Sequence, residues 1–138
     1  MTAGPSGLRM PEWFRQRALI SPHRLALVSG GERWTFADLD RRASAAATRL
    51  RAAGVRPRDR VALLVANGPG FVQMVHAAPR LGAVLVPLNT RLTAPELVAL
   101  VEDCEPALLI HDEANHDTAA SVSAAVAGGA YGLTELVK

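Results

Sequence analysis

The stretch VALLVANGPGFVQMVHAAPRLGAVLVPLNTRLTAPELVALVEDCEPALLIH, residues 61–111, decides the fold of this chain. Three uninterrupted apolar runs occur in it: Val61–Ala66, Ala83–Leu88 and Ala107–His111. Such runs are typical of strands that are covered on both faces, as in parallel sheets. Helix-like segments, Phe71–Leu81 and Ala94–Glu102, separate the runs. This order predicts right-handed parallel crossovers, and therefore an α/β fold with a mostly parallel sheet and flanking helices.

Helix signals support this interpretation. Thr93 followed by Glu96 forms a capping box, in which the hydroxyl and the carboxylate satisfy free backbone N–H groups. Thr35 with Asp38 begins an earlier helix in the same way, and Gly54 supplies its stop. The apolar face predicted for this earlier helix consists of Leu39, Ala43, Ala46, Ala47, Leu50 and Ala53. Pro79 lacks an N–H group, so we expect it to kink the Phe71–Leu81 helix.

Weaker signals lie on either side of these segments. Pro11–Ile20 begins with proline and is predicted to be a helix. Leu25–Ser29 and Arg33–Thr35 flank a Gly-Gly pair and are predicted to form a hairpin. Beyond Asp112 the pattern is weak, and it predicts only a helix near Thr118–Val126.

Length and composition favour one cytoplasmic domain. A chain of 138 residues has room for a single core, so we expect a flexible stretch at residues 1–9 and one α/β subdomain at 10–138. No run of about 18 uncharged apolar residues is present, which excludes a membrane span. The first residues lack the basic and apolar parts of a signal peptide. Cys104 is the only cysteine, so an internal disulfide is excluded, and we interpret it as a small core residue.

The charged residues give little indication of a nucleic-acid or metal partner. The net charge is +2, and the single lysine is Lys138. Arginines on the Thr35 helix could contact RNA or a membrane surface, but no aromatic residues interleave with them, which favours a solvated face and no nucleic acid. The histidines lack metal-ligand spacing and are interpreted as surface or strand-end residues: His23, His76, His111 and His116.

Motifs that carry chemistry are absent from the sequence. It has no phosphate-binding Gly-x-x-x-x-Gly-Lys loop, no Gly-x-Gly-x-x-Gly, no His-Glu-x-x-His and no Gly-x-Ser-x-Gly. Gly68 and Gly70 stand between a strand and a helix, where a phosphate loop could lie. Because Pro69 removes one N–H group from that loop, a plain strand-to-helix turn is the favoured interpretation.

Several blocks nevertheless match a known family in order and spacing. They are RWTFADL at 33–39, GVRPRDRVA at 54–62, Asn67, and LGAVLVPLN at 81–89. Together they resemble the N-terminal subdomain of AMP-forming acyl-CoA synthetases, over about Met10 to Asp112. The blocks WFRQRA at 13–18 and PLNTRL at 87–92 look most like o-succinylbenzoate-CoA ligases or medium- and long-chain fatty acyl-CoA ligases. Arg58 and Gly70 depart from the pattern, since the family usually has glycine and an acidic residue there.

The resemblance implies an enzyme that joins a carboxylate to ATP with Mg²⁺, and then passes the acyl group to CoA. The family's phosphate loop, ribose-binding aspartate and mobile catalytic lysine have no match here, so no catalytic residue is assigned. Thr134-Glu135 matches the letters of the family's Thr-Glu pair but lies upstream of the expected loop, and we interpret this match as coincidence. In such ligases the turn after the Ala83–Leu88 strand can lie near CoA, which makes Asn89, Thr90 and Arg91 the site candidates. Arg91 could pair with a phosphate; the alternative is a turn that only positions the next helix.

Three functional hypotheses stay open at this point. The chain is expected to be a truncated ligase that ends before the phosphate loop and is inactive alone. Its partners would then be the remainder of the ligase chain or a second copy of itself in a homodimer, because an interrupted sheet exposes apolar surface. The alternatives are a free-standing interaction module that pairs with itself or with a full-length ligase, and a minimal nucleotide-binding enzyme. The acyl substrate is not indicated by these residues.

Overall fold

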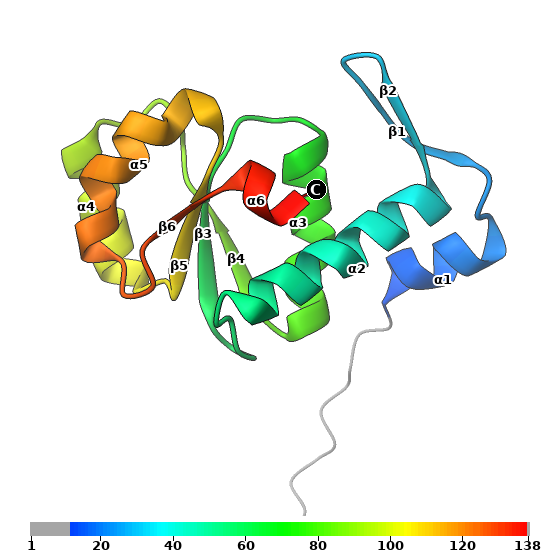
Figure 1. The fold of residues 1–138 in the computed structure, drawn as a ribbon, viewed down its shortest axis with the longest axis horizontal. Helices are drawn as coiled ribbons and strands as arrows, with labels where there is room; N and C mark the ends of the chain where they lie inside the picture. The colour runs from blue at the N-terminus through cyan, green and yellow to red at the C-terminus, as the bar shows by residue number, and fades with distance from the viewer. Residues whose placement is uncertain (1–11, 138) are drawn as a thin grey trace, which may run out of the picture.

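The computed structural model describes residues 12–137 and centres on a four-stranded parallel sheet. The strands lie in the order β4 (Val84–Pro87), β3 (Arg60–Leu64), β5 (Leu108–His111) and β6 (Ala130–Gly132). Helices cover both faces of this sheet (Figure 1). The prediction of an α/β fold with a parallel sheet and flanking helices is therefore confirmed.

The two faces of the sheet carry separate apolar cores. On one face, α2 (Phe36–Ala52), α3 (Pro69–Ala77) and α6 (Leu133–Val137) cover Leu63 and its same-side neighbours. On the other face, α4 (Ala94–Cys104) and α5 (His116–Val122) cover Leu64 and its neighbours. Successive strand residues point to opposite faces, and Leu63 and Leu64 are both fully buried. Each contributes about 1.5–3 kcal/mol through burial, which explains why these strands have no polar alternation.

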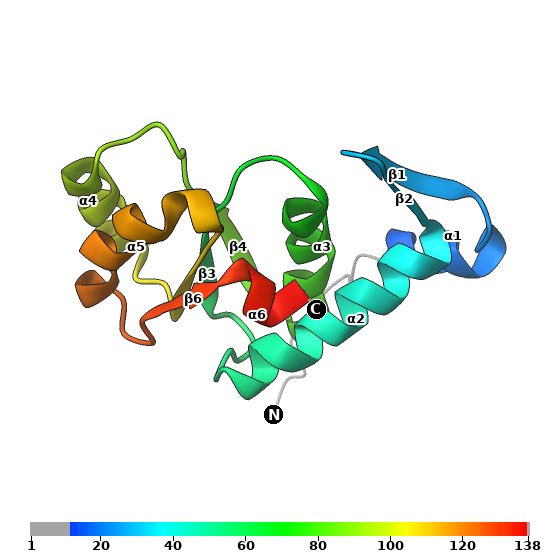
Figure 2. The same ribbon diagram turned by 45° about the horizontal axis from the view of Figure 1, so that its top comes forward.

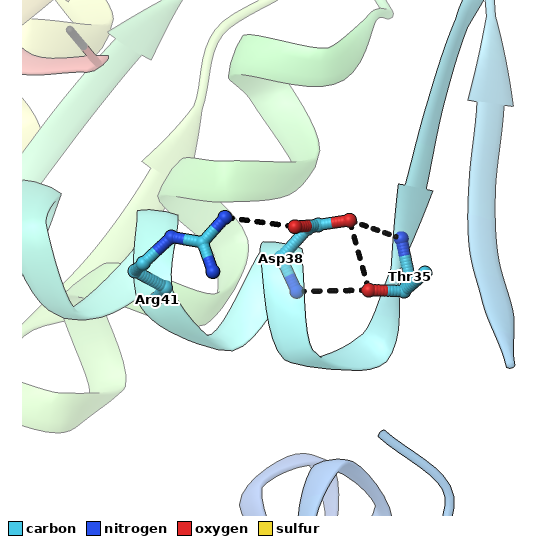
Figure 3. A network of polar contacts seen from close by, with 3 residues as sticks. All are labelled: Thr35, Asp38 and Arg41. Atoms are coloured by element: carbon cyan, nitrogen blue, oxygen red, sulfur yellow. Dashed lines mark hydrogen bonds and ion pairs between the residues drawn. The ribbon is translucent and has the colours of Figure 1, made fainter. Parts of the chain in front are cut away.

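The Thr35–Asp38 capping box begins α2 as predicted (Figure 3). Thr35 Oγ1 accepts a hydrogen bond from Asp38 N at 3.1 Å, and the Asp38 carboxylate accepts one from Thr35 N at 3.0 Å. On the predicted apolar face, every residue except the half-buried Ala53 is buried. The opposite face is not simply solvated, because Arg42 lies over the Trp34 ring and Arg49 donates to the backbone of α6.

Pro79 changes the type of helix rather than kinking one helix. The α-helix α3 ends at Ala77, and the chain continues as a 3₁₀-helix, η1 (Ala78–Leu81), with Pro79 inside it. Pro79 stands at the start of η1, where a missing N–H group is tolerated, and the segment ends at the left-handed Gly82.

The N-terminal elements project from the main body (Figures 1 and 2). β1 (Leu25–Ser29) and β2 (Glu32–Thr35) form the predicted antiparallel hairpin, and both turn glycines have positive φ. α1 (Trp13–Ile20) packs on α2, and its Phe14 stacks on His76 at 4.2 Å between ring centroids. Residues 1–11 and 138 lie outside the described residues, and with them the flexible stretch 1–9, the expected domain start at residue 10, the helix start at Pro11, and Lys138.

The C-terminal part holds two elements that the sequence did not predict. After α5 and a 3₁₀ turn, η3 (Ser123–Ala125), the chain forms β6 and then α6. The predicted helix near Thr118–Val126 is shifted, because α5 already ends at Val122. Gly128 brings the chain back to the sheet, where its N–H donates to Ala107 O at 2.9 Å and a Cβ would lie 2.2 Å from the same oxygen. Only glycine fits this approach.

Candidate functional site

A cleft of about 550 Å³ opens at the carboxyl ends of β3 and β4. It is lined by Val65, Ala66, Asn67, Phe71, Pro87, Leu88, Asn89, Thr90 and Arg91. The β3–α3 and β4–α4 connections, which supply most of these residues, lie along the same upper edge of the sheet in Figure 2. Ligands of open α/β sheets bind at this edge, where parallel strands end together.

The sequence-predicted residues Asn89, Thr90 and Arg91 lie side by side on one wall of the cleft. Asn89 Oδ1 accepts a hydrogen bond from Arg91 N at 2.9 Å, which closes a tight turn after β4. Leu88 anchors this turn because its N–H donates to Leu63 O at 2.9 Å. All three predicted residues are exposed. The guanidinium of Arg91 and the hydroxyl of Thr90 therefore remain accessible from solvent.

The opposite wall comes from the β3–α3 connection and was not predicted as part of a site. Asn67 and Phe71 line it, next to Ala66. Ala66 N donates to Asp112 Oδ2 at 2.8 Å, while Asp112 Oδ1 accepts from Asn115 N at 3.1 Å. Asp112 thereby ties the carboxyl end of β3 to the segment after β5. The available signal was the position of Asn67 directly after a buried strand.

The cleft has the chemistry of a binding site rather than of a reaction centre. Arg91, Thr90 and Asn89 offer hydrogen-bond donors, one of them charged, while Val65 and Phe71 offer apolar surface. This set fits a ligand that carries an anionic group on a partly apolar body. Within residues 12–137 no cluster of three or more His, Cys, Asp or Glu side chains could hold a metal ion.

The glycines near the cleft serve the fold. Gly68 precedes α3 with extended backbone, and a Cβ on Gly70 would lie 2.6 Å from Leu133 Cδ2 of α6. Glu135 Oε1 accepts from Gly132 N at 2.9 Å and so holds the first turn of α6. These contacts give Gly70 and Glu135 structural roles.

The histidines and the cysteine are spread over the fold. Burial, and then the charge of Arg80, lowers the pKa of His76 below its usual 6.5. His111 is buried at the end of β5 and lies edge-on to His116, with ring centroids 5.2 Å apart. Cys104 is half-buried at the end of α4, so it is less enclosed than the predicted core residue. No helix among residues 12–137 is long and apolar enough to cross a membrane.

The fold is that of an α/β domain with a parallel sheet, and its cleft lies at the carboxyl ends of the strands. Residues 14–136 match the family model described as AMP-binding enzyme. The chain therefore belongs to the AMP-binding enzyme family, and the resemblance of its sequence blocks is confirmed.

Relatives and solved structures agree on acyl-CoA ligases. A feruloyl-CoA synthase of Amycolatopsis sp is 45% identical over 112 residues, which are 81% of this chain and 23% of that protein. A 2-succinylbenzoate–CoA ligase of Geobacillus kaustophilus is 41% identical over 75% of this chain and 21% of its own length. The structure of o-succinylbenzoate CoA synthetase from Bacillus subtilis with AMP matches with a TM-score of 0.86 and 32% identity, over 93% of this chain and 32% of that one. The chain thus corresponds to a segment of such ligases and spans less than a quarter of these curated relatives.

Proposed function

We propose that this chain is the N-terminal α/β subdomain of an AMP-forming acyl-CoA ligase, ending before the phosphate loop. Such a ligase would join a carboxylate to ATP with Mg²⁺ and then transfer the acyl group to CoA. The observation that carries the proposal is the 45% identity to a feruloyl-CoA synthase over 81% of the chain. The B. subtilis synthetase, whose structure with ATP and magnesium has a TM-score of 0.86 to this chain, supports the choice of cofactors. ATP and CoA as substrates are consistent with a cytoplasmic location.

The cleft beside Asn89, Thr90 and Arg91 is proposed as the CoA-proximal part of that ligase. Arg91 would contact a phosphate group, and the apolar wall would contact the less polar part of the ligand. Titration of the isotope-labelled chain with CoA should shift the backbone NMR signals of residues 89–91. The Arg91→Gln variant should weaken this binding by about fivefold or more, whereas Arg33→Gln on the hairpin should not. Equal effects of both variants would contradict the assignment.

Alone, the chain is proposed to be inactive. Charge stabilisation around the phosphates is the main catalytic requirement of adenylation, and the described residues contain neither a lysine nor a cluster of metal ligands. The purified chain should release no pyrophosphate when supplied with ATP, Mg²⁺ and ferulic or o-succinylbenzoic acid. Measurable release above a heat-denatured control would refute this part of the proposal.

Exposed apolar side chains suggest what covers the N-terminal elements. Trp13, Leu19 and Ile20 of α1 are 65%, 77% and 76% exposed, and Leu25 and Val28 of β1 are also exposed. We call these residues the α1–hairpin surface and propose that the remainder of the ligase chain packs on it. A free-standing module that pairs with a second copy through the same surface is the alternative. The remainder of a related ligase, expressed as a separate chain, decides between them. A mixed complex that Leu19→Ser with Ile20→Ser weakens would favour the ligase segment, whereas a homodimer that persists in the presence of that chain would favour the module.

A further inference from the structure

Arginines gather at the amino-terminal edge of the sheet, on the side opposite the cleft. Arg51 lies in the last turn of α2, Arg56 and Arg58 lie in the loop before β3, and Arg60 begins β3; all four are exposed. Asp59 is the only acidic residue in 51–60, which leaves this segment a net charge of +3. Within residues 12–137, none of these arginines forms an ion pair with a carboxylate.

Part of this cluster has an evident structural role. Arg56 Nη1 donates to Arg51 O in the last turn of α2 at 3.5 Å and to Val55 O at 3.3 Å, and Arg60 Nη1 donates to Cys104 O at 3.0 Å. These guanidinium groups bind carbonyls at the ends of α2 and α4, where the helix dipole favours positive charge. Such contacts account for Arg56 and Arg60, but they do not involve Arg58.

Arg58 occupies a backbone conformation that its side chain makes unfavourable. Its φ is 73°, in the left-handed region that favours glycine. The turn itself is held by the backbone, because Arg58 N donates to Gly82 O at 2.8 Å. Glycine would therefore form the same turn with less strain. Because glycine would avoid this backbone strain, the presence of arginine at position 58 indicates that its side chain has a function.

A hollow of about 290 Å³ lies beside Arg51 and Arg56, two of these arginines. It is lined by Arg51, Val55, Arg56, Pro57 and Leu81. Val55 and Leu81 are buried and give the hollow an aliphatic floor. Guanidinium groups around an aliphatic hollow suit carboxylates next to an aliphatic side chain. They suit single-stranded nucleic acid less, because no aromatic ring is present for a base to stack on.

We propose that Arg51, Arg56 and Arg58 form a docking site for an acidic peptide segment of another protein, with an aliphatic side chain of that segment in the hollow. The site is separate from the cleft and independent of the proposed ligase activity. Because the positive charges are exposed, binding should weaken as salt increases.

The test uses a fluorescein-labelled peptide of alternating glutamate and leucine, with binding followed by fluorescence anisotropy. Arg58→Gly should weaken binding by about fivefold to tenfold and at the same time raise the urea midpoint of the chain, because it removes the strain. Arg51→Gln should weaken binding to a similar extent. Arg33→Gln is the matched control, since it removes one exposed charge at the far end of α2 and should change the affinity less than about twofold.

The two readouts of Arg58→Gly separate docking from a purely structural role. An unchanged affinity in this variant would overturn the proposal, as would an equal loss of affinity in Arg33→Gln. The proposal also fails if the peptide does not bind at about 1 mM. Tighter binding of a single-stranded RNA of equal length, weakened by the same variants, would show that the site accepts nucleic acid instead.

Discussion

Replacing Asp38 tests whether the capping box of α2 contributes to stability in the way the hydrogen bonds indicate. The Asp38 carboxylate accepts from Thr35 N at 3.0 Å, from Thr35 Oγ1 at 2.8 Å and from Arg41 Nη2 at 2.8 Å (Figure 3). Asp38→Ala removes all three contacts but leaves the bond from the backbone N of residue 38 to Thr35 Oγ1. The loss of half a capping box and of an exposed ion pair should lower the free energy of unfolding by about 1–2 kcal/mol.

The pH dependence of this effect has a definite sign. Hydrogen bonds from the backbone and side chain of Thr35 hold the pKa of Asp38 at about 2, below its usual 3.8. The carboxylate therefore adds stability that is fully present above about pH 4 and is lost as the pH falls towards 2. Urea unfolding followed by circular dichroism should show that the difference between wild type and Asp38→Asn shrinks over this range.

Two outcomes would refute this reasoning. In the first, Asp38→Ala lowers the free energy of unfolding by less than about 0.3 kcal/mol, well below the value of a lost helix cap. In the second, the difference between wild type and Asp38→Asn is the same near neutral pH as near pH 2.

Three further predictions concern other contacts. Gly128→Ala should lower the free energy of unfolding, measured with urea, by about 2–3 kcal/mol, because its Cβ would lie 2.2 Å from a backbone oxygen. Gly68→Ala, whose Cβ would have no atom within 4 Å, should lower it by about 0.5 kcal/mol or less. Arg80→Met should lower the free energy of unfolding by about 2–4 kcal/mol, because the Arg80 side chain is only 11% exposed and pairs with carboxylates of α2 and of the segment before α1. Arg41→Met, at a more exposed side chain, should lower it by less than about 0.5 kcal/mol. Equal losses in the two variants would contradict an effect of burial. The pKa of His76 is lowered in the folded state, so the free energy of unfolding should fall as the pH drops below 6.5. An NMR titration of folded protein that gives a pKa of His76 at or above 6.5 would disprove this prediction.

Three strands of the main sheet were predictable because strands that are buried on both faces consist of continuous apolar residues. β3, β4 and β5 all lie within the predicted runs or begin one residue earlier. β6 escaped prediction because it is only three residues long, half-buried and at the edge of the sheet. Its place depends on distant backbone contacts, such as Leu109 N to Gly129 O at 3.0 Å, which leave no local pattern.

The candidate site was predictable only in part. The family resemblance predicts Asn89, Thr90 and Arg91 as site residues, and the sheet places them at one wall of the cleft. Asn67 and Phe71 complete the cleft only because β3 and β4 are neighbours. Strand order is a property of the whole chain, so a local pattern could not show that these two turns meet.

The central position of β3 has a consequence for how the molecule assembles. β3 is the first strand of the main sheet to leave the ribosome, and in the order β4–β3–β5–β6 each later strand joins an outer edge of the strands already present. Each new strand can pair without separating two strands that are already paired, so the sheet can grow while the chain is being synthesised. Until β6 arrives, however, β5 carries an unpaired and strongly apolar edge, and that interval is when a nascent chain would be most open to aggregation or to capture by a chaperone.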